Sequence, residues 1–180
     1  IRQSYATGEV IGSEGVGGLA GDILTIDGGT PLITESYSTA NVSGSDEVGG
    51  LVGRQASGVI NKSYASGAVN GDSEVGGLIG RQDGGIVTES YATGDVSGSA
   101  LIGGLVGESN DAKITDSYWD VDTTGQTESP GGAVGLNTTE MIGSDAETNM
   151  VGFAFNRTWQ TRSGSYPVLK WQTTDDGENN

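Results

Sequence analysis

A sequence repeat of nearly constant length runs along most of this chain. Its clearest copy, residues 63–80, reads Ser-Tyr-Ala-Ser-Gly-Ala-Val-Asn-Gly-Asp-Ser-Glu-Val-Gly-Gly-Leu-Ile-Gly. The tyrosine of the unit recurs after 32, 27, 27 and 27 residues, and a leucine recurs in step with it. The tyrosines are Tyr5, Tyr37, Tyr64, Tyr91 and Tyr118, and the leucines are Leu19, Leu51, Leu78 and Leu105. A repeat this regular predicts stacked copies of one structural unit.

Each unit contains three strand-like segments separated by Gly, Ser and Asp residues. In the Val-Gly-Gly-Leu segment, valine and leucine lie three residues apart, so strict alternation cannot place them on one face and we expect a bend or a bulge at the glycine pair. The 33 glycines argue against helices, because glycine costs about 1 kcal/mol per residue in a helix interior. We therefore predict an all-β fold, a parallel β-solenoid with about three strands per 27-residue coil.

The units define the expected domain organisation. Residues 1–118 form about four coils, of which the first is longer because of an insertion at residues 22–31. Residues 119–172 lose the repeat and gain helix-starting patterns and most of the bulky aromatic residues, so we expect a C-terminal cap with short helices over the last coil. Residues 173–180 are expected to form a flexible tail. Ile1 already lies inside a unit, so we expect further repeats, a cap or another subunit at this end.

Charge and composition exclude several functions. The net charge of −16, from 24 acidic and 8 basic residues, makes nucleic acid an unfavourable partner. The acidity fits either an ordinary secreted protein or one adapted to concentrated salt, where screening removes self-repulsion. The absence of cysteine and histidine removes disulfides, thiolate sites and most zinc sites and nucleophile–base pairs. No apolar run reaches the length of a transmembrane span.

The Gly-Leu-x-Gly core of the units resembles the GLUG-motif repeats. The matching segments are Gly18–Gly21, Gly50–Gly53, Gly77–Gly80 and Gly104–Gly107, within a resemblance that covers roughly residues 1–119. The resemblance implies large exported surface proteins, such as haemagglutinin-like adhesins, surface-attached peptidases and exoproteins of bacteria and of salt-loving archaea. It also implies that the repeats are not themselves the catalytic module. The acidic, lysine-poor composition is most similar to the archaeal examples.

Two features are candidate binding sites. Asp120 and Asp122 precede Gly125 with part of the spacing of a calcium loop, so they are candidate Ca²⁺ ligands, and the alternative is a structural turn. No other cofactor is expected. The tyrosine column is the second candidate, because a solenoid turns it into a ladder of rings that either stacks on sugars or another protein or packs at the corner of each coil. Its members are Tyr5, Tyr37, Tyr64 and Tyr91.

Four Asn-x-Ser/Thr sequons are candidate glycosylation sites. They begin at Asn41, Asn61, Asn137 and Asn156. No carboxylate pair is fixed by the repeat, so no catalytic residues are assigned.

The sequence therefore predicts a non-enzymatic structural or adhesive rod, located outside the cell or on its surface. Its expected partners are other surface proteins, glycans or copies of itself. Two alternatives remain open: a subunit of a head-to-tail extracellular filament, and a carbohydrate-binding or polysaccharide-active β-helix module.

Overall fold

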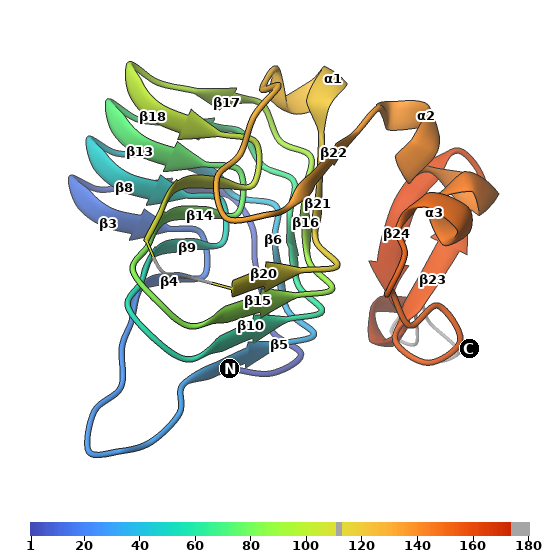
Figure 1. Ribbon diagram of the computed structural model, residues 1–180, viewed down its shortest axis with the longest axis horizontal. Helices are drawn as coiled ribbons and strands as arrows, with labels where there is room; N and C mark the ends of the chain where they lie inside the picture. Colours follow the sequence, from blue (N-terminus) through green and yellow to red (C-terminus); the bar gives the residue numbers. More distant parts are fainter. Residues whose placement is uncertain (111–112, 174–180) are drawn as a thin grey trace.

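The computed structural model describes residues 1–110 and 113–173. Its larger part is a stack of coils in which each strand pairs in parallel with its copies in the neighbouring coils (Figure 1). Tyr64, for example, is in register with Tyr37 on one side and with Tyr91 on the other. The predicted parallel β-solenoid is therefore confirmed.

Each coil of the described chain supplies one short strand to each of five parallel sheets. The tyrosine sheet contains β1 (Tyr5–Ala6), β6 (Tyr37–Ser38), β11 (Tyr64–Ala65), β16 (Tyr91–Ala92), β21 (Tyr118–Asp120) and β22 (Val134–Leu136). The next contains β2 (Glu9–Ile11), β7 (Asn41–Ser43), β12 (Val69–Asn70) and β17 (Val96–Ser97). The two sheets that flank the glycine pair contain β3 (Glu14–Gly17), β8 (Asp46–Gly49), β13 (Ser73–Gly76) and β18 (Ala100–Gly103), and β4 (Ala20–Ile23), β9 (Val52–Gln55), β14 (Ile79–Gln82) and β19 (Val106–Ser109). The last contains β5 (Leu32–Thr34), β10 (Val59–Asn61), β15 (Ile86–Thr88) and β20 (Lys113–Thr115).

The strand count per coil is five rather than about three, because two of the three predicted segments are divided. The Ser-Tyr-Ala segment breaks between β11 and β12, and the Val-Gly-Gly-Leu segment breaks at the predicted bend, between β13 and β14. At that bend, a Cβ added to Gly77 would overlap the carbonyl oxygen of Gly104 in the next coil. The glycine is therefore required because backbone approaches backbone there.

A left-handed residue turns the chain at the corner before each tyrosine. Glu35, Lys62 and Glu89 occupy this corner with φ angles of 49°, 49° and 46°. The serine that follows each of them is buried and links the coils: the Ser36 amide donates to Ser63 Oγ at 3.3 Å, and Ser63 Oγ donates to the Asn61 carbonyl at 2.8 Å. These hydrogen bonds satisfy buried backbone groups and offset the strain of the corner.

The interior consists of columns of identical or similar side chains. Leu51, Leu78 and Leu105 are fully buried in one cluster with the isoleucine and valine columns, and a second cluster contains mainly valines. No coil could bury these residues alone, so stacking supplies the hydrophobic stabilisation.

The chain covers the last coil after β21 with residues 121–136, which we call the end cover. It begins with α1 (Val121–Thr124) and ends with β22. The Glu128 carbonyl accepts from the Gly104 amide at 3.0 Å, and Ser129 Oγ accepts from the Val106 amide at 2.9 Å. The Trp119 ring lies against Gly104. The end cover thus satisfies strand-edge groups that the last coil would otherwise expose.

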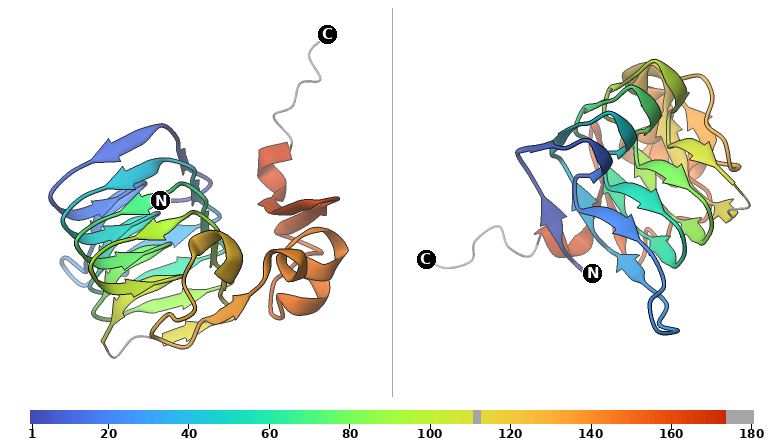
Figure 2. Two further views of the ribbon diagram at one scale, coloured as in Figure 1. Left: turned by 90° about the horizontal axis from the view of Figure 1, so that it is seen from above. Right: turned by 90° about the vertical axis from the view of Figure 1, so that its left-hand side faces the viewer.

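Residues 137–173 form a flank module that lies beside the tyrosine sheet (Figures 1 and 2). It contains α2 (Thr138–Met141), α3 (Gly143–Asn149), the antiparallel strands β23 (Trp159–Arg162) and β24 (Ser165–Leu169), and the 3₁₀ helix η1 (Lys170–Thr173). The predicted short helices are present. Their bulky aromatic neighbours, however, pack against the tyrosine column on the side of the stack rather than over its last coil.

The insertion of the first coil is a loop between β4 and β5 that projects from the stack in Figure 1. The tail expected at residues 173–180 lies outside the described residues from residue 174 onward. Among the helices of the described residues, none is long and apolar enough to span a membrane.

Candidate functional site

The tyrosine column forms a ladder of stacked rings along one flank of the solenoid. The ring centroids of Tyr5 and Tyr37 are 5.3 Å apart, and those of Tyr37, Tyr64 and Tyr91 follow at 4.9 Å, with interplanar angles of 9° or less. This spacing follows from the distance between paired strands, about 4.8 Å. The fifth tyrosine, Tyr118, packs against Phe153 instead, with an interplanar angle of 62°.

The flank module covers most of this ladder. Trp171 packs against Tyr37 at a centroid distance of 5.8 Å, and Trp159 packs against Tyr91 at 5.6 Å. Tyr64 and Tyr91 keep only 6% and 2% of their surface exposed, whereas Tyr5 keeps 59%. The candidate ligand-binding role is therefore corrected for Tyr64 and Tyr91, because their faces are occupied by the chain itself.

The hydroxyl groups of the covered rings are hydrogen-bonded to the module. Tyr91 OH donates to the Pro167 carbonyl at 2.6 Å, and Tyr64 OH accepts from Gln172 Nε2 at 2.8 Å. Burial raises the pKa of Tyr64 to about 12 and raises the pKa of Tyr91 well above its usual value. Both phenols are consequently neutral at ordinary pH and serve as packing groups with one polar anchor each.

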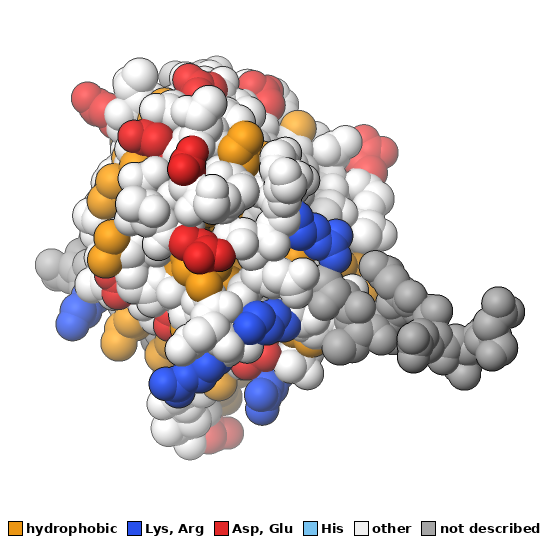
Figure 3. Space-filling view, turned by 90° about the vertical axis from the view of Figure 1, so that its right-hand side faces the viewer, with side chains coloured by type: hydrophobic (Ala, Val, Ile, Leu, Met, Phe, Trp, Pro, Cys, Tyr) orange, Lys and Arg blue, Asp and Glu red, His pale blue; other side chains and the backbone are white. Residues whose placement is uncertain are grey.

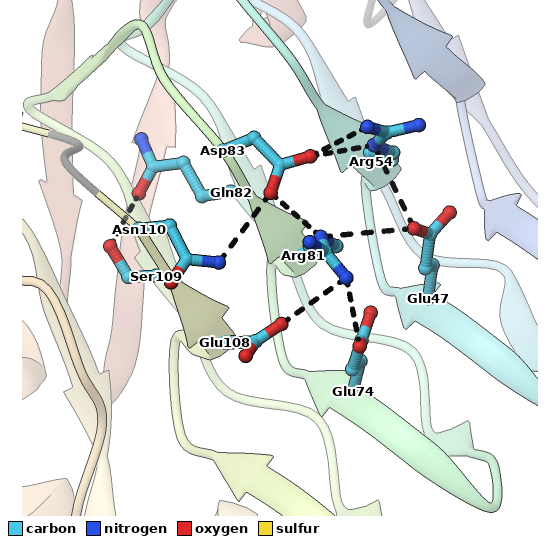
Figure 4. Close-up of polar contacts among 9 residues, drawn as sticks. All are labelled: Glu47, Arg54, Glu74, Arg81, Gln82, Asp83, Glu108, Ser109 and Asn110. Atoms are coloured by element: carbon cyan, nitrogen blue, oxygen red, sulfur yellow. Dashed lines mark hydrogen bonds and ion pairs between the residues drawn. The ribbon is translucent and has the colours of Figure 1, made fainter.

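A network of charged side chains bridges the coils where the sheet that contains β9, β14 and β19 meets the sheet that contains β8 and β13 (Figure 4). Arg54 pairs with Asp83 at 2.7 Å and with Glu47 at 3.7 Å. Arg81 pairs with Asp83 at 2.7 Å and Glu74 at 3.1 Å. Glu108 of the next coil completes the network at 3.4 Å from Arg81. We call these six residues the charged ladder.

The electrostatics of the charged ladder indicate a structural role. Burial raises the pKa of Glu47 and of Glu74, against the opposing effect of the arginines. Burial alone would raise the pKa of Asp83 too, but hydrogen bonds from Arg81 and Arg54 lower it. Both guanidinium groups are engaged by carboxylates, so neither is free to bind a substrate. Among the described residues, no group of three or more acidic side chains is arranged to hold a metal ion.

Sequence reasoning missed the charged ladder, although a signal was present. Asp22, Arg54, Arg81 and Glu108 occupy the same position in successive units. A solenoid places such a column on one line, so the opposite charges of Arg81 and Glu108 in successive units predict an ion pair between their coils.

The candidate calcium ligands belong to a hydrogen-bonded hub instead. Asp120 is fully buried and caps α1, with Oδ1 accepting from the Asp122 amide at 2.8 Å. Its Oδ2 accepts from Thr138 Oγ1 at 2.7 Å and from Tyr166 OH at 2.5 Å. Asp122 Oδ2 accepts from the Thr138 amide at 2.9 Å. These donors occupy the oxygens that a Ca²⁺ ion would need, which favours the structural turn.

The four sequons differ in accessibility. Asn41 and Asn156 are exposed, whereas Asn137 caps α2 through its own side chain. The Oδ1 atom of Asn61 is buried and accepts no hydrogen bond from the described residues. The structure thus leaves Asn41 and Asn156 as the accessible candidates for glycosylation.

Comparisons with known proteins agree with this architecture. Residues 71–97, one whole coil, match the family described as "The GLUG motif", and the other coils repeat its structure in register. Among solved structures, a "putative immunoglobulin A1 protease" from Bacteroides ovatus is similar, with a TM-score of 0.72 and 26% sequence identity over 93% of this chain. This chain spans 56% of that protein. No curated protein matches.

Proposed function

We propose that this chain is a structural, non-enzymatic segment of a secreted or cell-surface protein, a stiff rod that serves attachment or assembly. The observation that carries the proposal is the continuity of the columns. Leucine, serine and tyrosine columns run through every complete coil of the described chain. The buried serines of these columns form hydrogen bonds from one coil to the next. Such a stack resists bending because each coil is hydrogen-bonded along its length to its neighbours.

The adhesin-like assignment rests on the GLUG motif and on the acidic composition. A strongly acidic, cysteine-free solenoid suits an exposed location, where net charge maintains solubility. Surface proteins or glycans are the proposed partners. Immunogold labelling of intact producing cells, with an antibody against the solenoid, tests the location. Label on unpermeabilised cells is expected, and label that requires permeabilisation would contradict the proposal.

We further propose adaptation to concentrated salt, as in exoproteins of salt-loving archaea. With 24 acidic residues against 8 basic ones, self-repulsion is strong at low ionic strength, and a Debye length of about 3 Å at 1 M salt removes most of it. Circular dichroism during titration with KCl tests this: the β spectrum should become more stable to heating as salt rises. A melting temperature independent of salt would refute the adaptation.

The structure offers less support to a head-to-tail filament and to a polysaccharide-cleaving module. A head-to-tail filament needs free strand edges at both ends, and the end cover occupies the edge of the last coil at Gly104 and Val106. Polysaccharide cleavage needs a free acid and base, and the carboxylates of the charged ladder are ion-paired. A reducing-end assay with neutral and acidic polysaccharides checks the second point, and measurable cleavage would overturn the non-enzymatic role.

A further inference from the structure

The flank module contains a polar cleft that the solenoid does not use. It lies between the start of α3 and the turn that joins β23 to β24, and its volume is about 400 Å³. Its polar lining residues are Ser144, Asp145, Thr161, Arg162 and Ser163. The volume falls within the range of roughly 300–1,000 Å³ that is usual for sites of small molecules.

The charged groups of this cleft are not engaged elsewhere. Within the described part of the chain, the Arg162 guanidinium and the Asp145 carboxylate form no hydrogen bond or ion pair with another side chain. Arg54 and Arg81, in contrast, are held by carboxylates 2.7 Å away. Two opposite charges and the Ser144 and Ser163 hydroxyls are therefore available to a molecule in the cleft.

The flank that carries the module also differs in charge from the rest of the chain. The module, residues 137–173, contains three acidic and three basic residues, whereas the whole chain has 24 acidic against 8 basic ones. On this face, the basic side chains gather in the lower part and the acidic ones lie mainly above them (Figure 3). A partner at this flank avoids the repulsion that the acidic solenoid exerts on other surface molecules.

The lining chemistry selects among ligand classes. A simple anion would be repelled by Asp145, a simple cation would be repelled by Arg162, and an apolar molecule would desolvate both without compensation. A ligand with several hydroxyl groups satisfies the whole set, because each hydroxyl both donates and accepts: it donates to the carboxylate and accepts from the guanidinium.

We propose that this cleft binds a neutral hexopyranose, such as the terminal sugar of a cell-surface glycan. The proposal goes beyond the rod function, because it places a specific recognition site on the module and not on the repeats. Its failure would leave the rod function intact. The cleft contains no aromatic platform, so binding is weak, with a Kd on the order of 1 mM.

Saturation-transfer-difference NMR of the whole chain tests the proposal, with the methyl glycosides of glucose, galactose and mannose as neutral probes and galacturonate as the anionic probe. At least one glycoside should receive saturation. Arg162→Ala and Asp145→Asn should each weaken its binding about tenfold, because the first removes the guanidinium donors and the second replaces a charged acceptor with a weaker neutral one. Arg157→Ala is the matched control, since Arg157 is an exposed arginine of the same module that does not line the cleft.

The outcomes separate cleanly. Transfer to a neutral glycoside that is lost in both cleft variants and retained in Arg157→Ala supports the site. Absence of saturation transfer to any of the three glycosides overturns the proposal. An equal loss of binding in Arg162→Ala and Arg157→Ala also overturns it. Binding of galacturonate in preference to the neutral sugars would show that the charge argument is wrong. Unchanged circular dichroism spectra exclude misfolding, which is not expected for exposed side chains.

Discussion

The phenol rings of Tyr64 and Tyr91 lie face to face, 4.9 Å apart and 2° from parallel, although 27 residues separate them in the chain. Rings stack in this way only when one coil lies on the next without offset. The pair therefore shows, on the covered flank of the solenoid, the same register that the leucine column has in the interior. The stability of the solenoid should depend on these columns more than on any single coil.

Truncation of one leucine in the buried column tests this dependence. Leu78→Ala removes a fully buried side chain and leaves a cavity between two coils, so it should lower the free energy of unfolding by about 2–5 kcal/mol. Leu101→Ala is the control, because Leu101 is 50% exposed and should cost less than about 0.5 kcal/mol. Urea unfolding followed by circular dichroism measures both, and equal losses would contradict the column.

A methyl group at the glycine bend should be poorly tolerated. In Gly77→Ala, the new Cβ would overlap the Gly104 carbonyl oxygen and press on Ala92 at 2.8 Å, so the coils must separate. The expected loss is about 1–3 kcal/mol, the usual cost of overpacking. Gly29→Ala, whose Cβ would meet only the Ile26 carbonyl oxygen at 3.7 Å, should change the melting temperature little. Tolerance of both would show that the bend is not tightly packed.

Alkaline pH should destabilise the packing of the flank module on the tyrosine ladder. Burial raises the pKa of Tyr64 to about 12 from a usual value of 10.0, so the folded state favours the neutral phenol. This contribution is complete below pH 10 and is lost as the pH rises toward 12. Thermal melts across this range should show a falling midpoint, with a smaller fall in Tyr64→Phe. An identical pH profile for the variant would contradict the assignment.

The Asp120 hub should be important for folding without any need for calcium. Asp120→Ala removes a helix cap and leaves the half-buried hydroxyl donors of Thr138 and Tyr166 without their acceptor, at a cost of about 2–4 kcal/mol. Asp122→Ala, at an exposed position, should cost less. EDTA should leave the melting temperature of the unmodified protein unchanged. A clear decrease with EDTA that calcium restores would reinstate the metal site.

The charged ladder should contribute modestly and in a salt-dependent manner. Arg81→Met leaves Glu74, Asp83 and Glu108 close together without their shared counter-charge, and should lower stability by about 1 kcal/mol at low salt. Because salt screens the carboxylates from one another, the difference should shrink in 1 M KCl. A loss that is independent of salt would indicate that the arginine acts through packing alone.

The sequence was sufficient to predict the architecture of the repeating part of the chain. The 27-residue period identifies which residues share a column, and the Val-Gly-Gly-Leu spacing locates the bend that the structure has between Gly76 and Ile79. The repeat period does not tell where the chain turns a corner within one unit. The sequence therefore predicted three strands per coil, whereas two of these segments are each divided into two shorter strands. The period also does not predict the ion pairs of Arg54 and Arg81 with Glu47, Glu74 and Asp83, because these carboxylates occupy other positions of the repeat unit.

The flank module could not be placed from the sequence because its contacts are not periodic. The indole of Trp171 donates to the carbonyl of Glu35 at 2.8 Å across 136 residues, and no local pattern encodes that pairing. The aromatic residues signalled that a surface would be covered. They did not indicate that the surface was the tyrosine ladder, on the side of the stack, rather than the last coil.

Disulfide trapping of the register tests the central claim most directly, because the chain has no native cysteine. Asn70 and Ser97 are register partners whose side chains are hydrogen-bonded at 2.9 Å. Asn70→Cys with Ser97→Cys should oxidise rapidly, whereas Asn70→Cys with Asp95→Cys, displaced by two residues, should remain reduced. Efficient oxidation of the displaced pair, with the in-register pair remaining reduced, would contradict the stacking of identical positions on which this account depends.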